Sequence, residues 1–231
     1  MKERALIISA HPDDDILGCG GFISKFKKKY NFRVVFIAEG SSCRFSNLKK
    51  DKDKIAKTIE TRNEYAIKAL KTLSVEDVKF YNLPCGRLDN EPIIEINKII
   101  EKEIIQYDPK ILFTHSEKDT NNDHKVIYKS SMMAARPGIF KSLESVISYE
   151  VLSSTEWNYA DAFTPNYFVS LSESNVKDKW RALKCFTSEI KSFPHPRSEE
   201  GIATLASYRG IQSGFKYAEA FKIIRSFQKW I

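Results

Sequence analysis

Short apolar runs alternate with longer segments of helical periodicity through the first part of the chain. Short runs of this kind are typical of buried strands, and they cover residues 5–9, 34–38, 78–81 and 111–114. The helices predicted between and after them lie near residues 17–30, 56–72, 92–107 and 123–135. This alternation predicts an α/β fold, Rossmann-like, with a mostly parallel sheet covered by helices on both faces.

The apolar runs in the remaining part of the chain predict a less regular addition to this sheet. Apolar runs at residues 146–152 and 166–171 predict strands that extend the sheet or add to its edge. Two further helices are expected near residues 176–188 and 200–208. The link between them holds His195 between two prolines, and the restricted backbone of proline makes this link a stiff, non-helical loop.

Length and composition fit one globular domain over residues 1–231, with 42% hydrophobic and 12% aromatic residues. No apolar run is long enough to span a bilayer, and the first residues lead into a strand without a signal-peptide pattern. We therefore expect a cytoplasmic protein without a transmembrane segment. The four cysteines, Cys19, Cys43, Cys85 and Cys185, form no Cys-x-x-Cys pair, which predicts free thiols rather than a disulfide framework or a thiolate zinc site.

The net charge of +7 comes largely from basic stretches such as residues 25–29 and 49–54. Such charge can attract nucleic acid, anionic lipid or a phosphorylated substrate, but a charge run is most often a solvated helix face. No zinc-finger, RNP or helix-turn-helix signature is present. We therefore expect no nucleic-acid partner, and the charge is compatible with an anionic small molecule.

The densest group of chemically active side chains follows the first predicted strand, where His11 stands close to Asp13, Asp14 and Asp15. Ligands of α/β proteins bind at the carboxyl ends of such strands. Because neighbouring carboxylates repel one another, their clustering suggests a cation that offsets their charge. Capping of the next helix is the alternative, but it accounts for one aspartate rather than three with a histidine.

The glycines at positions 18, 20 and 21 come directly after these aspartates. They lack the full dinucleotide-binding fingerprint. We expect them to allow close packing of a helix on the sheet.

A second polar group, residues 114–124, follows the fourth predicted strand and ends at His124. Catalytic zinc sites take three protein ligands from histidine and carboxylate and leave one position for water. His11, Asp14 and His124 supply such a set, and Asp13 is the candidate base that takes a proton from the zinc-bound water. Iron, manganese or cobalt would also suit these ligands. His115 is interpreted as an ordinary histidine at a strand end.

The chain resembles the PIG-L/LmbE-like zinc-dependent N-deacetylases, which remove acetyl groups from N-acetylglucosamine-type substrates. The resemblance rests on Ala-His-Pro-Asp-Asp at residues 10–14, Leu-Gly-Cys-Gly-Gly at residues 17–21 and the pair Asp123-His124. Weaker similarity covers residues 62–64, 83–88, 164–166 and 182–184. The resemblance implies an LmbE-like deacetylase fold, zinc ligands equivalent to His11, Asp14 and His124, and a general base equivalent to Asp13.

One position departs from the family pattern. Many relatives carry a histidine three residues before the last zinc ligand, where it helps to stabilise the oxyanion, and this chain has Asn121 there. Either the Asn121 amide donates a hydrogen bond to the oxyanion or another donor takes over, and His195 is the preferred substitute. Loss of such a donor without replacement costs about two orders of magnitude in rate.

Three arginines are candidates for substrate binding because guanidinium groups reach sugar hydroxyls or phosphate. They are Arg44, Arg62 and Arg87, and an arginine matching Arg62 contacts substrate in relatives. Surface salt bridges are the alternative role for each. Trp157 and Tyr159 could form a wall for a sugar ring or pack into the core, and core packing is the commoner role of aromatic residues.

These observations predict a zinc hydrolase that removes acetyl from a small-molecule N-acetyl amino sugar, free or on an aglycone. A sugar-binding protein that has lost catalysis is one alternative, favoured only by Asn121. A zinc amidase acting on a non-sugar acyl amide is another. The oligomeric state is open, and a homo-oligomer is compatible with the sequence.

Overall fold

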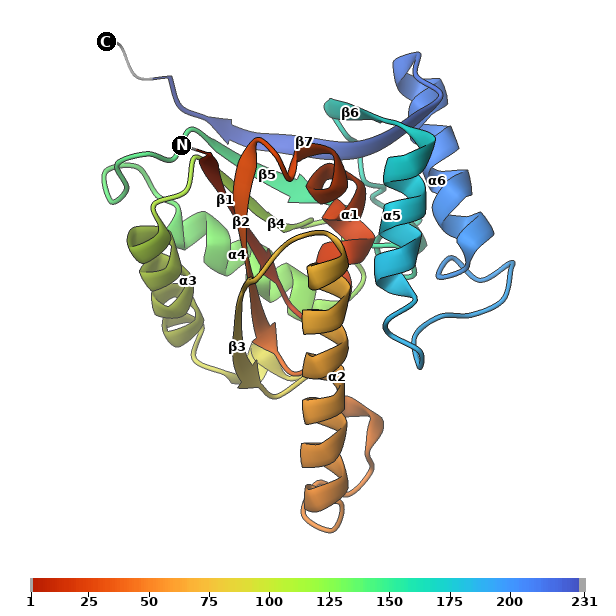
Figure 1. Ribbon diagram of the computed structural model, residues 1–231. Coiled ribbons are helices and arrows are strands. Elements are labelled where there is room, and N and C mark those ends of the chain that lie inside the picture. The colour runs from red at the N-terminus through yellow and green to blue at the C-terminus, as the bar shows by residue number, and fades with distance from the viewer. Residues whose placement is uncertain (1, 229–231) are drawn as a thin grey trace.

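Seven strands form one mixed sheet in the computed structural model, which describes residues 2–228 (Figure 1). The strands are β1 (Glu3–Ser9), β2 (Tyr30–Ala38), β3 (Asp77–Leu83), β4 (Ile111–His115), β5 (Ser145–Tyr149), β6 (Tyr167–Leu171) and β7 (Tyr217–Ser226). Their order across the sheet is β3-β2-β1-β4-β5-β7-β6. The first five strands in this order are parallel, and β7 runs antiparallel to both of its neighbours.

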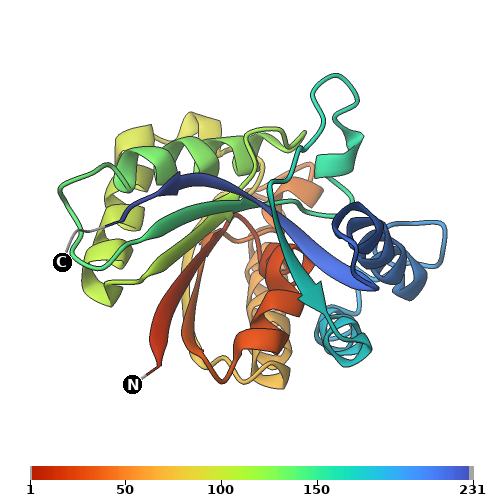
Figure 2. The same cartoon turned by 90° about the horizontal axis from the view of Figure 1, so that it is seen from above.

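The α-helices among the described residues cover both faces of the sheet (Figures 1 and 2). They are α1 (Asp14–Phe26), α2 (Lys52–Thr72), α3 (Ile93–Tyr107), α4 (Asn122–Ala134), α5 (Glu173–Leu183) and α6 (Glu199–Ser213). Helices α3 and α4 lie on one face, and α1, α2, α5 and α6 lie on the other. None of the helices within residues 2–228 combines the length and apolarity needed to cross a membrane.

The period-two pattern of the central strands divides the core between these faces. On β1, Ala5 and Ile7 belong to the apolar cluster that contains Phe22, whereas Leu6 and Ile8 belong to the cluster beneath α3 and α4. Because β1 is buried on both faces, its residues read as a continuous apolar run instead of an alternating one. The predicted α/β fold with a mostly parallel sheet is confirmed.

Strand β7 is not among the strands that the apolar pattern predicts. It lies between β5 and β6, so these two predicted strands are not neighbours in the sheet. Its first half contains Ala218 and Ala220, and alanine has a low strand propensity. The strand conformation of this segment therefore depends more on pairing with β5 and β6 than on its local sequence. Helix α1 also begins at Asp14 and ends at Phe26, which leaves Tyr30 to start β2 rather than to end the helix.

Gly18 allows α1 to lie directly against the sheet. A Cβ atom at this position would stand 2.2 Å from Cδ2 of Tyr149, whose side chain is fully buried. We expect Gly18→Ala to lower the free energy of unfolding by about 1–3 kcal/mol, because overpacking outweighs the gain in helix propensity. Denaturant titration measures this change. Glu60→Ala, on an exposed part of α2, serves as the control, and an unchanged midpoint for Gly18→Ala would rule out the close contact.

The sheet order also fixes where a ligand can enter. Strand β1 lies between β2 and β4, and the helices that follow β1 and β4 leave toward opposite faces of the sheet. In open α/β sheets such a point of divergence forms a crevice at the carboxyl ends of the strands. His11 and Asp14 follow β1, and His124 follows β4, so the topology brings the two polar groups of the sequence to one crevice.

Candidate metal centre

His11, Asp14 and His124 converge at this crevice, and each of them is buried. One ligand atom from each residue lies within 4.8 Å of the others. Oδ2 of Asp14 is 3.3 Å from Nδ1 of His11 and 3.2 Å from Nε2 of His124. Asp14 is placed in the first turn of α1, where its Oδ2 accepts a hydrogen bond from the backbone N–H of His11. The turn thus aims both side chains at one point.

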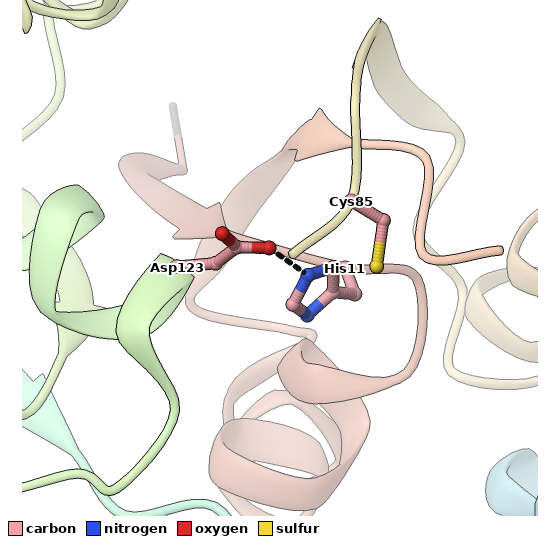
Figure 3. A group of neighbouring side chains, drawn as sticks. All are labelled: His11, Cys85 and Asp123. Atoms are coloured by element: carbon pink, nitrogen blue, oxygen red, sulfur yellow. Dashed lines mark hydrogen bonds and ion pairs between the residues drawn. The ribbon is translucent and has the colours of Figure 1, made fainter. Parts of the chain in front are cut away.

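Two further carboxylates hold the outer nitrogens of the imidazoles. Asp123 Oδ2 lies 2.8 Å from Nε2 of His11 (Figure 3), and Asp119 Oδ2 lies 3.0 Å from Nδ1 of His124. A carboxylate on the far nitrogen of a histidine fixes the ring orientation and raises its basicity as a metal ligand. Burial alone would raise the pKa of Asp119, but His124, Ser154 and Thr155 lower it to about 2.

The arrangement fits a divalent metal ion. Tetrahedral zinc with bonds of about 2.0–2.1 Å places neighbouring ligand atoms roughly 3.3 Å apart, and the two distances from Asp14 Oδ2 match this spacing. Nε2 of the buried His124 ring has no hydrogen-bond partner within the described residues. Because a buried polar atom without a partner is costly, the Nε2 atom that faces Asp14 is well suited to a metal.

Asp13 stands at the centre of a network of charged groups. Its Oδ2 accepts hydrogen bonds from Nη2 of Arg62 at 2.9 Å and from Nη1 of Arg197 at 2.8 Å. Glu189 accepts hydrogen bonds from the same two arginines, at 2.7 Å from Nη1 of Arg62 and at 2.9 Å from Nη1 of Arg197. It also forms an ion pair with Nη2 of Arg44 at 2.8 Å. Burial raises the pKa of Glu189, but the arginine charges outweigh it and hold the pKa at about 2. This network fixes the Asp13 carboxylate, whose Oδ1 has no hydrogen-bond partner among residues 2–228.

The family profile of PIG-L, described as GlcNAc-PI de-N-acetylase, matches residues 6–135, more than half of the 231 residues. The chain belongs to the PIG-L family. The matched region runs from β1 to the end of α4 and contains all three residues of the candidate metal centre.

Individual relatives of this PIG-L protein carry the name deacetylase. The uncharacterized deacetylase YaiS of Escherichia coli K12 is 29% identical over 190 residues, which cover 79% of this chain and 90% of YaiS. The diacetylchitobiose deacetylase of Thermococcus kodakarensis is 24% identical over 229 residues, covering 96% and 83% of the two chains.

One solved structure shows that this fold serves more than one reaction. The 4-carboxy-2-hydroxymuconate hydratase GalB of Pseudomonas putida KT2440 superposes with a TM-score of 0.73 at 21% identity, covering 99% of this chain and all of GalB. The fold alone therefore does not distinguish a deacetylase from a hydratase. The choice between these two reactions has to be argued from the side chains of the site.

The three consecutive aspartates of the PIG-L protein have three different surroundings. Asp14 faces the two histidines, Asp13 pairs with the arginines, and Asp15 is fully buried with neither carboxylate oxygen hydrogen-bonded within the described residues. Burial and the nearby Asp13 charge raise the pKa of Asp15 to about 8. Asp13 occupies the N-cap position of α1 but its side chain makes no capping hydrogen bond. Helix capping therefore does not explain this cluster.

The two candidates for the oxyanion donor lie in different settings. Oδ1 of Asn121 accepts the backbone N–H of Asp123 and so caps α4. Nδ1 of the half-buried His195 accepts the backbone N–H of Arg197, which leaves the proton of a neutral ring on Nε2. Burial and neighbouring cations lower the pKa of His195, which favours this neutral form. Because Arg197 also bonds Asp13, the loop that carries His195 runs beside the site.

The predicted substrate-binding arginines of the PIG-L protein differ in burial and in how many of their nitrogens already make contacts. Arg62 is buried. Its Nη1 donates a hydrogen bond to Glu189 and its Nη2 donates one to Asp13, so these contacts orient Asp13. Arg44 is about half exposed and ends a short 3-10 helix after β2. Arg87 is half-buried and follows β3. Substrate contact stays a prediction for all three. Trp157 and Tyr159 are exposed, which excludes the core-packing role for them.

Several residues of the site were not found from the sequence. No pattern in the sequence marks Asp119, Glu189 or Arg197 as a residue of the site. The Asp123-His124 pair was noted, but not the contact of Asp123 with His11. His115, interpreted as a strand-end histidine, stacks on His124 with ring centroids 3.9 Å apart and accepts the backbone N–H of Ala10.

Proposed function

We propose that this protein is a metal-dependent N-deacetylase that hydrolyses the acetamide of an N-acetylated amino sugar. The observation that carries the proposal is the convergence of His11, Asp14 and His124 at the crevice, with a carboxylate behind each imidazole. The names of the relatives support a deacetylase, and the T. kodakarensis relative is named for an N-acetylated sugar. Zinc is the cation we propose, because two imidazoles and one carboxylate suit it.

The chain supplies a base and a donor for this reaction. When bound, a divalent cation polarises the acetyl carbonyl and lowers the pKa of water. Asp13 takes the proton of the attacking water, and its free Oδ1 suits this role because Oδ2 is held by two guanidinium groups. The same proton then passes to the departing nitrogen. The Nε2–H group of His195 stabilises the oxyanion, and acetate and a free amine leave.

A hollow beside Arg62 provides room for the rest of the substrate. Its volume is about 410 Å³, and its lining includes the cations of Arg44, Lys54, Lys57 and Arg62. A group of this size accommodates a sugar substituent. Because Arg44 and Arg62 are already paired with Glu189 and Asp13, Lys54 and Lys57 are the lining cations that favour a negatively charged substituent. We therefore propose that the substrate carries an anionic aglycone.

The deciding experiment measures acetate released by zinc-loaded protein from a panel of N-acetylated compounds. The panel contains free N-acetylglucosamine, N-acetylhexosamines with phosphate-containing or carboxylate-containing aglycones, neutral glycosides and simple N-acetyl amines. We expect turnover of the amino sugars with a preference for the anionic aglycones. Turnover of simple amines alone would identify an amidase, and sugar binding without acetate release would identify a protein that has lost catalysis.

The two oxyanion candidates are separated by comparing His195→Ala with Asn121→Ala. We expect His195→Ala to lower kcat by about 100-fold with little change in stability. Asn121→Ala removes a helix cap and should lower the free energy of unfolding by about 1 kcal/mol, with a smaller effect on kcat. Asn121→Ser retains a capping side chain and is the matched control. A larger kcat loss in Asn121→Ala than in His195→Ala would reverse the assignment.

A further inference from the structure

Two cysteines lie in contact at the rim of the metal centre, although the sequence separates them widely. The Sγ atoms of Cys43 and Cys85 are 3.0 Å apart. Cys43 is exposed on the segment after β2, and Cys85 is buried on the segment after β3. Cys85 also belongs to a group with His11 and Asp123 whose ligand atoms lie within 4.8 Å of one another (Figure 3). The other two cysteines, Cys19 and Cys185, have no such neighbour among residues 2–228.

A buried carboxylate holds the two cysteine segments together. Glu39 accepts the backbone N–H groups of Ser41 at 2.5 Å and Ser42 at 2.9 Å, which immediately precede Cys43. Its other oxygen accepts the backbone N–H of Cys85 at 2.9 Å. The thiol contact is therefore set by a network of backbone hydrogen bonds, and the more accessible thiol faces solvent.

We propose that Cys43 and Cys85 form a redox pair that closes an intrachain disulfide and thereby weakens the metal centre. Hydrogen peroxide is the oxidant class. The Cys43 thiol attacks one peroxide oxygen, the O–O bond breaks, and a sulfenic acid and one water form. The Cys85 sulfur then attacks the Cys43 sulfur, the S–O bond breaks, and the Cys85 proton leaves with the hydroxyl as a second water. A dithiol reductant returns both thiols.

The link to the metal centre runs through the residue next to Cys85. The backbone N–H of Gly86 donates to Asp123 Oδ2 at 2.6 Å, and the same oxygen lies 2.8 Å from Nε2 of His11. A disulfide requires its sulfurs to approach to about 2.05 Å, closer than the 3.0 Å that separates them here. In the proposed oxidised state the segment with Cys85 and Gly86 moves with this closure. Gly86 already lies close to Cys43, since a Cβ on Gly86 would stand 3.1 Å from the Cys43 Cβ. Loss of an outer partner of a ligating histidine lowers metal affinity by about 10–100-fold.

The test uses zinc-loaded protein, residues 1–231, treated with hydrogen peroxide and then with an alkylating agent. Peptide mapping by mass spectrometry should find Cys43 joined to Cys85, and zinc retained against a competing chelator should fall by at least about tenfold in affinity. Dithiothreitol should reverse both changes. Cys43→Ser should form no such cross-link and should keep its zinc under peroxide, whereas Cys185→Ser, the matched control, should respond like the unaltered protein.

Two results would overturn this proposal. One is the absence of the Cys43–Cys85 peptide after peroxide treatment, and the other is formation of that peptide with unchanged zinc retention. Only the metal readout rests on the proposed function, because the peptide map requires neither metal nor substrate. A protein that forms the cross-link but hydrolyses no N-acetyl compound would therefore contradict the proposed function alone.

Discussion

Asp13→Asn should lose about 10²–10⁴-fold in kcat while it keeps its zinc, because the amide cannot take a proton from water. Asparagine is the informative substitution for two reasons. Its Oδ1 can still accept the hydrogen bonds that Arg62 and Arg197 donate to Asp13. The Asp13 backbone has φ of 121°, a region in which asparagine is better tolerated than most residues. The measurement is acetate release together with the zinc content of the purified protein.

Asp15→Asn is the matched control for this experiment. Asp15 is buried next to the same ligands, and its carboxylate oxygens make no hydrogen bond within the described residues. The amide therefore keeps the size of the side chain and breaks no hydrogen bond seen there. We expect zinc content and kcat of Asp15→Asn to stay within a few-fold of the unaltered protein. Full activity in a zinc-loaded Asp13→Asn sample would exclude Asp13 as the base.

His124→Ala should lose both the metal and the activity. The alanine removes one of three proposed ligands. Loss of a residue that only supports a ligand lowers metal affinity by up to about 100-fold, so we expect the loss of a ligand itself to lower zinc affinity by more than that. Zinc content after dialysis against a chelator measures the change, and circular dichroism checks that the fold persists. Stoichiometric zinc in folded His124→Ala would place the metal elsewhere.

A smaller loss of zinc affinity is expected when a residue that contacts a proposed ligand is changed. Asp119→Asn keeps the size of the side chain that faces His124 Nδ1 but removes its charge, and zinc affinity should fall by about 10–100-fold. Asp161→Asn, on an exposed carboxylate paired with Lys118, is the control and should bind zinc like the unaltered protein. Equal zinc affinity in both variants would show that the carboxylate behind His124 has no influence.

The sequence predicts the candidate ligands well because each follows a recognisable strand. His11 and Asp14 come directly after β1, and His124 lies in the first turn of the helix after β4. Parallel strands deliver their carboxyl ends to one edge, so local patterns were sufficient to expect that these residues meet. Their role as metal ligands stays a prediction that the zinc experiments test.

The contacts around Asp13 could not be predicted in the same way. Arg197 is 184 positions from Asp13, and it reaches the site from an irregular loop before α6. Neither helical nor strand periodicity marks such a residue. The meeting of Cys43 and Cys85 has the same origin, because it depends on how two loops are held by Glu39 rather than on cysteine spacing.

The position of β7 has a consequence for synthesis of the chain. Residues 217–226 fill the gap between β5 and β6, which the ribosome releases much earlier. Until residue 226 has emerged, both of those strands present open edges on the nascent polypeptide, and open edges invite pairing between chains. This part of the sheet is therefore completed only after β7 has been made, later than the pairing of the five parallel strands.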